Sequence, residues 1–470
     1  MPKLKTWQLT AGSAVAGLAL AAGAVAVAGP WDSGQRKAER DLAAAQDRTG
    51  GAHHEAARPD PADPAPAPSA RGVLSALGAP AGAGAPSGHL KEVLEPLLGS
   101  AALGSVQSAS VVDAATGTQL YGSGERTVMT PASTVKIATT VAALSALGPD
   151  HRIATTVLAT PDARKVVLKG GGDPTLEKEG LRTLAADTAR ALRDKGAGPV
   201  SVAYDTSLYA GPDIHPIGKG NENLARVTSL MVNEGRTNGS SSGTADRTPD
   251  PAGDAARAFA DELRGAGVEV TGRPAAEKAP ADAEPVAKVL SAPLSALVER
   301  TLTNSDNDIA EALARQTALA AGEEVSFAGA GKAVYDRLAK LDLPAQGALN
   351  GAHFADGSGL DRADKVSAAL LTGLLARAAD PAHPELRPVL TGLPVAGFSG
   401  TLSTRYSGAA GPGLVRAKTG TLSGVNTLAG TAVTKGGRLV AFAFLAGDTV
   451  DADAAQKALD ALASALTTAP

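Results

Sequence analysis

Residues 414–447 read LVRAKTGTLSGVNTLAGTAVTKGGRLVAFAFLAG, and this stretch decides the fold. Its apolar segments are rich in Val, Leu and Phe and are separated by turns that contain glycine, which is typical of consecutive strands. We predict three strands here, over Leu414–Lys418, Asn426–Val433 and Leu439–Leu445. The periodicity of Ala454–Leu466 predicts an amphipathic helix after them.

Similar patterns mark the start of the ordered chain, near His89. Apolar residues recur at helical spacing just after it, and SVQSASVVDAATGTQLYGSG (105–124) predicts two strands joined by a turn at Asp113–Gly117. A helix follows, which we expect Thr130 to cap and Pro131 to open. Strands and helices at both ends of the ordered chain predict a single sheet with helices packed on it, in the α/β class of the α+β type.

The composition is that of a globular protein. Of 470 residues, 44% are hydrophobic and 20% are charged, which excludes wholesale disorder. A formal net charge of −4 gives no general attraction to nucleic acid, and we expect none as a partner. The count of 0 cysteines excludes disulfides, a thiolate nucleophile and thiolate metal sites.

The N-terminal region predicts export. Lys3 and Lys5 precede an uncharged apolar run, Ala11–Gly29, that contains Ala-x-Ala sequences, so residues 1–29 are expected to be a signal peptide. If uncleaved, the same run would be an anchor and the one point of membrane contact. In either case the rest of the chain is expected outside the cytoplasm, secreted or anchored to the membrane.

The remaining chain divides by composition. Residues 30–88 are an Ala/Pro/Gly mixture expected to be a disordered linker. We expect a catalytic domain in two parts, 89–170 and 286–470, around inserted sequence at 171–285. Within the insertion, the polar stretch Arg236–Gly253 is expected to be an exposed loop.

The first motif that carries chemistry is Ser133-Thr134-Val135-Lys136. A spacing of three places both functional side chains on one face of a helix. Near other cations the lysine can lose its proton close to neutral pH and act as base for the serine hydroxyl. If Thr130 caps the helix, the Ser133 N–H has no helical partner and provides half of an oxyanion hole.

Two later motifs complete the expected site. In Ser305-Asp306-Asn307 the serine can relay a proton to the leaving amine and the asparagine can hold a substrate amide, while Asp306 is expected to be structural. In Lys418-Thr419-Gly420 the lysine and threonine can bind a substrate carboxylate, and the glycine lets the substrate backbone approach the strand. The amide of Thr421 is the expected second oxyanion donor, and Arg416 could join the cationic cluster.

These three motifs, in this order, resemble those of the penicillin-recognising serine enzymes, the penicillin-binding proteins and serine β-lactamases. Over residues 90–465 the chain is similar to the D-alanyl-D-alanine carboxypeptidase/endopeptidase family of the DacB, or penicillin-binding protein 4, type. The further stretches that carry this resemblance are Gly170–Leu176, Tyr204–Tyr209, Met231–Arg236, Asp356–Leu360, Leu393–Gly397 and Gly400–Leu402. One departure lies at His215–Gly218, where many relatives have a tryptophan.

The resemblance implies a transpeptidase/β-lactamase-like core, an antiparallel sheet flanked by helices, with an inserted domain. It implies a serine D-Ala-D-Ala carboxypeptidase or endopeptidase that acts on peptidoglycan stem peptides through an acyl-enzyme and that β-lactams trap covalently. Catalytic roles carry over to Ser133, Lys136, Ser305, Asn307 and Lys418, and substrate binding to Thr419, Gly420 and Thr421. It implies no metal and no organic cofactor.

Two alternatives stay open. A β-lactamase needs an activated water for deacylation, and no glutamate stands in a motif that would supply one. A catalytically inactive cell-wall-binding protein of the same fold would not need the motif residues, all of which are present.

The seven histidines show no metal-ligand spacing and are expected in the linker or at the surface. Asp356-Gly357-Ser358-Gly359 is expected to be a structural turn near the site.

Overall fold

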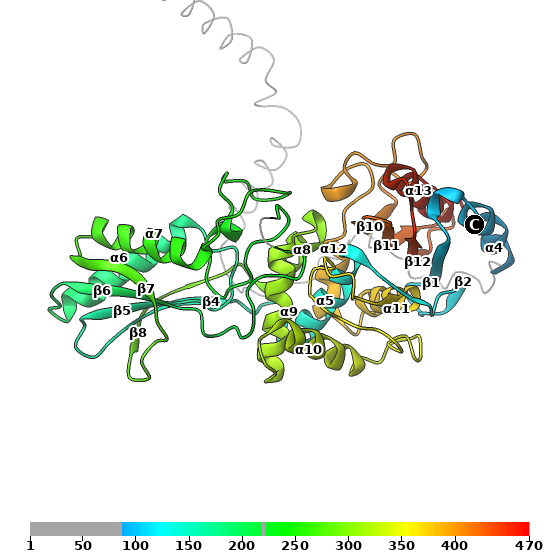
Figure 1. Ribbon diagram of the computed structural model, residues 1–470. Coiled ribbons are helices and arrows are strands. Elements are labelled where there is room, and N and C mark those ends of the chain that lie inside the picture. The colour runs from blue at the N-terminus through cyan, green and yellow to red at the C-terminus, as the bar shows by residue number, and fades with distance from the viewer. Residues whose placement is uncertain (1–86, 219–220, 470) are drawn as a thin grey trace, which may run out of the picture. The chain divides into compact units, whose positions relative to one another are not determined.

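The computed structural model describes residues 87–218 and 221–469, and its main sheet joins the two ends of this range (Figure 1). The sheet is antiparallel, with the strand order β10-β11-β12-β1-β2. Its strands are β1 (Val106–Asp113), β2 (Gln119–Ser123), β10 (Val415–Leu422), β11 (Val425–Val433) and β12 (Leu439–Gly447). Because β1 pairs with β12, the two ends close one sheet, as the sequence predicts.

Side chains alternate between two buried faces of this sheet. Phe442 and Phe444 of β12 lie on one face, whereas Ala443 and Leu445 lie on the other. The first face is covered by α4 (Ser87–Leu98) and α13 (Ala452–Thr468). A strand that is apolar on both faces belongs in the middle of a layered domain, which is where β12 lies.

Helices from the middle of the chain cover the second face of the sheet. They form its largest apolar core, in which Leu370 and Leu374 pack against Ala441 and Ala443. These helices are α5 (Lys136–Leu147), α8 (Leu294–Asn304), α9 (Asn307–Ala321), α10 (Phe327–Ala339), α11 (Ala368–Ala379) and α12 (Arg387–Thr391). A short pair of strands, β3 (Val128–Met129) and β9 (Val366–Ser367), leads into α5 and α11.

A second sheet of five strands lies between the first and second motifs in the sequence. Its order is β7-β6-β5-β4-β8, with α6 (Lys178–Asp194) and α7 (Pro251–Gly265) sharing its apolar core. The strands are β4 (Ala154–Ala159), β5 (Lys165–Lys169), β6 (Val200–Asp205), β7 (Val270–Ala276) and β8 (Glu284–Leu290). This sheet therefore takes in two strands that precede residue 171, and the predicted bounds of the insertion stay a prediction.

The polar stretch Arg236–Gly253 is only in part the exposed loop that the sequence predicts, because residues 237–239 and 241–244 are exposed but both ends of the stretch are not. Its last residues begin α7, capped by Asp250, and the side chains of Arg236 and Arg247 are only 3% and 5% exposed. Arg236 pairs with the buried carboxylate of Glu234, and Arg247 pairs with Asp308 on α9 at 2.9 Å. These two arginine side chains can be buried because each is paired with a carboxylate.

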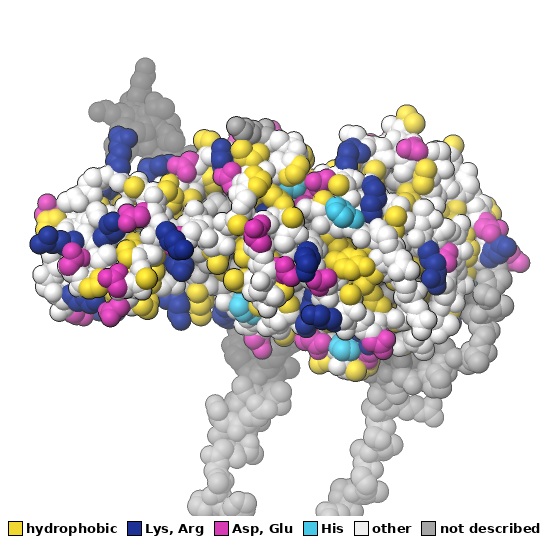
Figure 2. Space-filling view, turned by 60° about the horizontal axis from the view of Figure 1, so that its bottom comes forward, with side chains coloured by type: hydrophobic (Ala, Val, Ile, Leu, Met, Phe, Trp, Pro, Cys, Tyr) yellow, Lys and Arg dark blue, Asp and Glu magenta, His cyan; other side chains and the backbone are white. Residues whose placement is uncertain are grey.

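Surface charges of both signs are mixed. On the face in Figure 2, Lys and Arg side chains lie among Asp and Glu side chains. Some are directly paired, as Lys332 is with Glu323 and Asp336. The predicted signal or anchor at 1–29 and most of the predicted linker lie outside the described residues. Among those that are described, no helix has the length and apolarity to cross a bilayer.

Candidate active site

Ser133 and Lys136 meet at the start of α5. The serine lies in a 3-10 turn, Ala132–Val135, and the lysine is the first residue of the α-helix. Lys136 Nζ lies 3.0 Å from Ser133 Oγ, within hydrogen-bond distance. The serine is partly accessible whereas the lysine side chain is fully buried, so the amine can reach the hydroxyl but not bulk water.

The turn that carries Ser133 differs from the predicted helix start. Ala132 has φ 48°, an unfavourable left-handed conformation for a residue with a Cβ, and this breaks the helix before Ser133. Thr130 is not a cap, because its hydroxyl is bonded to Lys365 Nζ at 2.7 Å instead. Within the described part of the chain, the Ser133 N–H donates no hydrogen bond. This donor is therefore available, as predicted, although for a different local reason.

The second motif lies at the junction of α8 and α9. Ser305 ends α8 with left-handed backbone (φ 59°), and the Asp306 carboxylate caps α9 by accepting from Ile309 N at 3.0 Å. Asn307 then begins α9 and accepts a 2.7 Å hydrogen bond from Lys136 Nζ through Oδ1. Its amide nitrogen donates to the Asn223 carbonyl at 2.9 Å. The motif thus contacts the first motif through Asn307, while no hydrogen bond of the Ser305 side chain is present within the described residues.

The third motif lies on β10, the edge strand of the main sheet. Thr419 Oγ1 is 3.0 Å from the hydroxyl of Thr401, while Thr421 is exposed. Gly420 faces the Ser133 turn so closely that a Cβ there would lie 2.7 Å from the Pro131 carbonyl oxygen. The absence of a side chain at 420 is therefore what allows β10 to pack on the turn that carries the serine.

Lys418 and Lys136 are two fully buried amines whose charges disfavour each other. Burial lowers the pKa of Lys136 to about 8, although Asp356, Asp306 and Glu311 act in the opposite direction. Burial and the charge of Lys136 together hold the pKa of Lys418 well below its usual range. Desolvation is the main cause, so the predicted cationic cluster contributes less than expected, and Arg416 is exposed.

A turn at Asp356–Gly359 completes the environment of Lys136. The Ser358 carbonyl oxygen accepts a 2.6 Å hydrogen bond from Lys136 Nζ, which makes it the third acceptor around this nitrogen. The Asp356 carboxylate holds the turn by accepting from the backbone N–H groups of Ser358 and Gly359. The sequence indicates a turn near the site, but not that its carbonyl binds the lysine.

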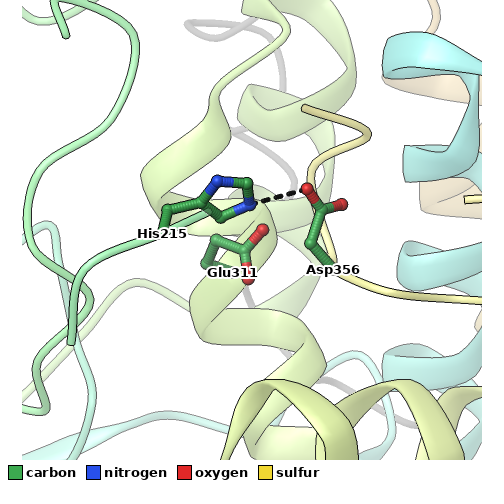
Figure 3. A group of neighbouring side chains, drawn as sticks. All are labelled: His215, Glu311 and Asp356. Atoms are coloured by element: carbon green, nitrogen blue, oxygen red, sulfur yellow. Dashed lines mark hydrogen bonds and ion pairs between the residues drawn. The ribbon is translucent and has the colours of Figure 1, made fainter. Parts of the chain in front are cut away.

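His215 is the site residue that the sequence analysis missed. It is 3% exposed rather than at the surface, and its Nε2 lies 2.8 Å from Asp356 Oδ2 (Figure 3). Burial opposes protonation, but the hydrogen bond to Asp356 and the charge of Glu311 raise the pKa of His215 overall. Only the departure from relatives near His215–Gly218 drew attention to this position, and it gave no indication of the partner.

The family follows from comparison with known sequences. The model of the D-Ala-D-Ala carboxypeptidase 3 (S13) family matches residues 90–246 and 234–468, which together include all three motifs. The chain belongs to this family. It is therefore an enzyme of the D-Ala-D-Ala carboxypeptidase type, as its motifs predict.

Two curated relatives agree with this S13 assignment. A protein named carboxypeptidase DacB from Mycolicibacterium smegmatis is 36% identical over 437 residues, covering 88% of this chain and 91% of the relative. A D-alanyl-D-alanine carboxypeptidase from an Actinomadura species is 31% identical over 429 residues, covering 73% of this chain and 78% of the relative. Both alignments cover more than two thirds of this chain.

Solved structures support the fold of this S13 peptidase. Penicillin-binding protein 4 (dacB) of Haemophilus influenzae superposes with a TM-score of 0.63 at 23% identity, covering 80% of this chain and 97% of that one. A complex of the same protein with a β-lactam gives a TM-score of 0.60 at 24% identity, with the same coverage. The predicted antiparallel sheet flanked by helices, in a penicillin-recognising fold with additional structure, is confirmed.

Proposed function

We propose that this S13 peptidase hydrolyses D-Ala-D-Ala termini of peptidoglycan stem peptides, with Ser133 as nucleophile and Lys136 as general base. The observation that carries the proposal is the 3.0 Å contact between Ser133 Oγ and a fully buried Lys136 Nζ. Burial lowers the pKa of this lysine to about 8, so a useful fraction is neutral near physiological pH. A neutral amine at this distance can accept the hydroxyl proton.

The first half-reaction forms an ester on Ser133. Its Oγ attacks the carbonyl carbon of the penultimate D-Ala while the hydroxyl proton moves to Lys136 Nζ. The negative charge on the carbonyl oxygen is stabilised by the available Ser133 N–H and, we propose, by the N–H of Thr421. The C–N bond then breaks, and the leaving amine takes the proton held by Lys136, relayed through Ser305, so that Lys136 is neutral again.

The second half-reaction returns the enzyme to its starting state. Water gives a proton to Lys136 Nζ as it attacks the ester carbonyl, the bond to Ser133 Oγ breaks, and the serine takes that proton from Lys136. The stem peptide leaves with a new carboxylate at the former penultimate D-Ala. Endopeptidase action on a cross-link is the same chemistry with a larger amine as leaving group.

Lys418 and Thr419 are the proposed partners of the terminal substrate carboxylate. Lys418 Nζ donates to the Thr419 carbonyl at 2.7 Å, and no carboxylate pairs with it among the described residues. An arriving carboxylate would supply the missing counter-charge and stabilise the protonated amine. The segment 394–396 bonds to the outer edge of β10 as far as Ala417, so a peptide backbone can add alongside the strand beyond that residue.

β-Lactam labelling tests the nucleophile. We expect a fluorescent penicillin to label wild-type protein, and intact mass and peptide mapping to place one adduct on Ser133. Ser133→Ala should give no label, and Lys136→Ala should label far more slowly. An unlabelled wild type, or equal labelling of Ser133→Ala, contradicts the proposal and favours an inactive wall-binding protein.

Turnover separates the proposed peptidase from a β-lactamase. We expect nitrocefin to give a single burst of about one equivalent per protein, because the acyl-enzyme hydrolyses slowly. Sustained nitrocefin turnover with no release of D-Ala from an N-acylated peptide ending in D-Ala-D-Ala would favour the β-lactamase.

Purified muropeptides, both monomeric and cross-linked, identify the preferred leaving group when the products are resolved by mass. A substrate in the cell wall also leads us to propose an extracytoplasmic location. Cell fractionation with an antibody against the protein tests that location.

A further inference from the structure

Three buried polar side chains from separate segments meet behind the proposed general base. His215 comes from the segment between the first two motifs, Glu311 from α9, and Asp356 from the turn after α10 (Figure 3). Each is at most 3% exposed, and their ligand atoms lie within 4.8 Å of one another. None of these three residues contacts Ser133, yet two of them hold structure that contacts Lys136.

The cluster forms its own hydrogen bonds rather than an open set of metal ligands. Asp356 Oδ2 accepts from His215 Nε2 at 2.8 Å and from Asp361 N at 2.7 Å. Glu311 pairs with Arg315 through Oε2 at 3.0 Å and accepts from Gly357 N through Oε1 at 3.1 Å. These bonds occupy the atoms that a cation would need, so the arrangement favours a positioning role.

The hydrogen bonds around His215 assign its tautomer. The N–H of Ile217 donates to Nδ1 at 3.1 Å, so that nitrogen carries a lone pair and the ring hydrogen lies on Nε2. The neutral ring therefore donates to Asp356. The Phe327 ring lies nearly perpendicular to the imidazole, at 5.2 Å between ring centroids, and packs against it.

A continuous path leads from this imidazole to the base. His215 Nε2 binds Asp356, the Asp356 carboxylate binds the N–H of Ser358, and the Ser358 carbonyl oxygen binds Lys136 Nζ at 2.6 Å. Each step is a buried hydrogen bond, so the turn has little freedom to move without breaking one of them.

We propose that His215 is a positioning residue for the reaction, which holds the Asp356–Gly359 turn so that the Ser358 carbonyl keeps Lys136 Nζ directed at Ser133. This inference rests on the proposed function, in which Lys136 is the base. It also gives the inserted segment a part in acylation that does not require contact with substrate.

Asparagine and glutamine at position 215 test the hydrogen bonds of the two ring nitrogens separately. Asn can accept from Ile217 N, as Nδ1 does, but is too short to reach Asp356, whereas Gln can place its amide N–H near the position of Nε2. We expect His215→Asn to lower the penicillin acylation rate constant roughly tenfold and His215→Gln to restore it to within about threefold of wild type. The affinity of the preceding non-covalent complex should change less than about twofold in both.

Gln316 provides the matched control. It is 3% exposed on α9 and donates to the Gly171 carbonyl at 2.8 Å, so it joins the same segments without reaching Asp356. We expect Gln316→Leu to lower the melting temperature but not the acylation rate constant. Equal acylation losses in Gln316→Leu and His215→Asn overturn the inference, and so does an unchanged rate in His215→Asn. If His215→Asn does not fold, His215→Leu is compared with His215→Gln instead, because leucine also lacks the donor to Asp356.

Crystal structures of the two His215 variants test the inference without a measurement of activity. We expect the Ser358 oxygen to leave hydrogen-bond distance of Lys136 Nζ in His215→Asn and to keep it in His215→Gln. If the 2.6 Å contact persists in His215→Asn, the inference is overturned even where the proposed function holds. Failure of wild-type protein to acylate at Ser133 instead rejects the proposed function, and the two failures are therefore distinct.

Discussion

Asn307 Oδ1 accepts a 2.7 Å hydrogen bond from Lys136 Nζ, although the two residues are 171 positions apart in the sequence. This bond joins the first residue of α9 to the first residue of α5 and fixes the amine between two motifs. Because the lysine is fully buried, each acceptor around it affects both its direction and its charge.

Replacement of Asn307 tests these two effects separately. Asn307→Ala removes an acceptor and should slow acylation about 10- to 100-fold, the cost of leaving a buried donor less satisfied. Asn307→Asp places a carboxylate beside the amine, raises the pKa of Lys136, and should slow acylation at neutral pH but recover it in alkali. Penicillin acylation measured from pH 6 to 10 distinguishes the two. Asn238→Asp, on an exposed loop, adds the same charge as a control and should leave the profile unchanged.

The pH dependence of the wild type should follow Lys136. Its pKa is lowered to about 8, and the neutral form is the one that accepts a proton from Ser133. We therefore expect acylation to rise about tenfold per pH unit below this pKa and to level off above it. Stopped-flow or quenched acylation assays at fixed ionic strength provide the measurement, and a flat profile between pH 6 and 9 contradicts the assignment.

Lys418 should give the opposite pH dependence, because it acts in binding of the substrate carboxylate. Its pKa lies well below the usual lysine range, so binding of a carboxylate requires the amine to take up a proton that becomes scarcer as pH rises. We expect the non-covalent affinity for a carboxylate-bearing penicillin to fall with increasing pH, while that for its methyl ester does not. Lys418→Ala should reduce the preference for acid over ester by about 10- to 100-fold. An equal preference in wild type and variant would show that the carboxylate binds elsewhere.

Gly420 should tolerate no side chain. A Cβ at this position would lie 2.1 Å from Thr427 Oγ1 and 3.1 Å from the Cβ of Ala132. Gly420→Ala should therefore cost about 1–3 kcal/mol in the free energy of unfolding and displace β10 from the Ser133 turn, with slower acylation. Gly265→Ala is the control, because nothing lies within 4 Å of its added Cβ. Denaturant unfolding and penicillin labelling of both variants test this, and similar behaviour of the two would contradict the packing argument.

Local patterns were enough to predict the main sheet. The predicted strands Asn426–Val433 and Leu439–Leu445 correspond to β11 and β12, and the closing helix corresponds to α13, each within a few residues. Their apolar periodicities are regular because both faces of the sheet are buried. The start of α5 was predicted less well, since the left-handed Ala132 that begins the 3-10 turn before α5 packs closely against β10, a contact between distant parts of the sequence.

Long-range pairing of buried polar groups could not be predicted. His215 and Asp356 are 141 positions apart, and Arg247 and Asp308 are 61 apart. From the sequence, a charged or imidazole side chain in an irregular segment is expected at the surface, because the distant partner that allows its burial is not part of the local pattern. The motifs gave the proposed reacting groups because those depend on short spacings, whereas the groups that hold them depend on the tertiary fold.

Two buried pairs join the segment 154–290 to α9 and to the turn after α10, and they have an evolutionary consequence. Removing this segment would take Arg247 and His215 away from the carboxylates of Asp308 and Asp356. Such a deletion would also remove a bond that holds the turn beside Lys136, so it would not simply give a smaller enzyme. A lineage could gain or lose this segment only if the residues that contact it, on α9 and in the turn after α10, changed at the same time.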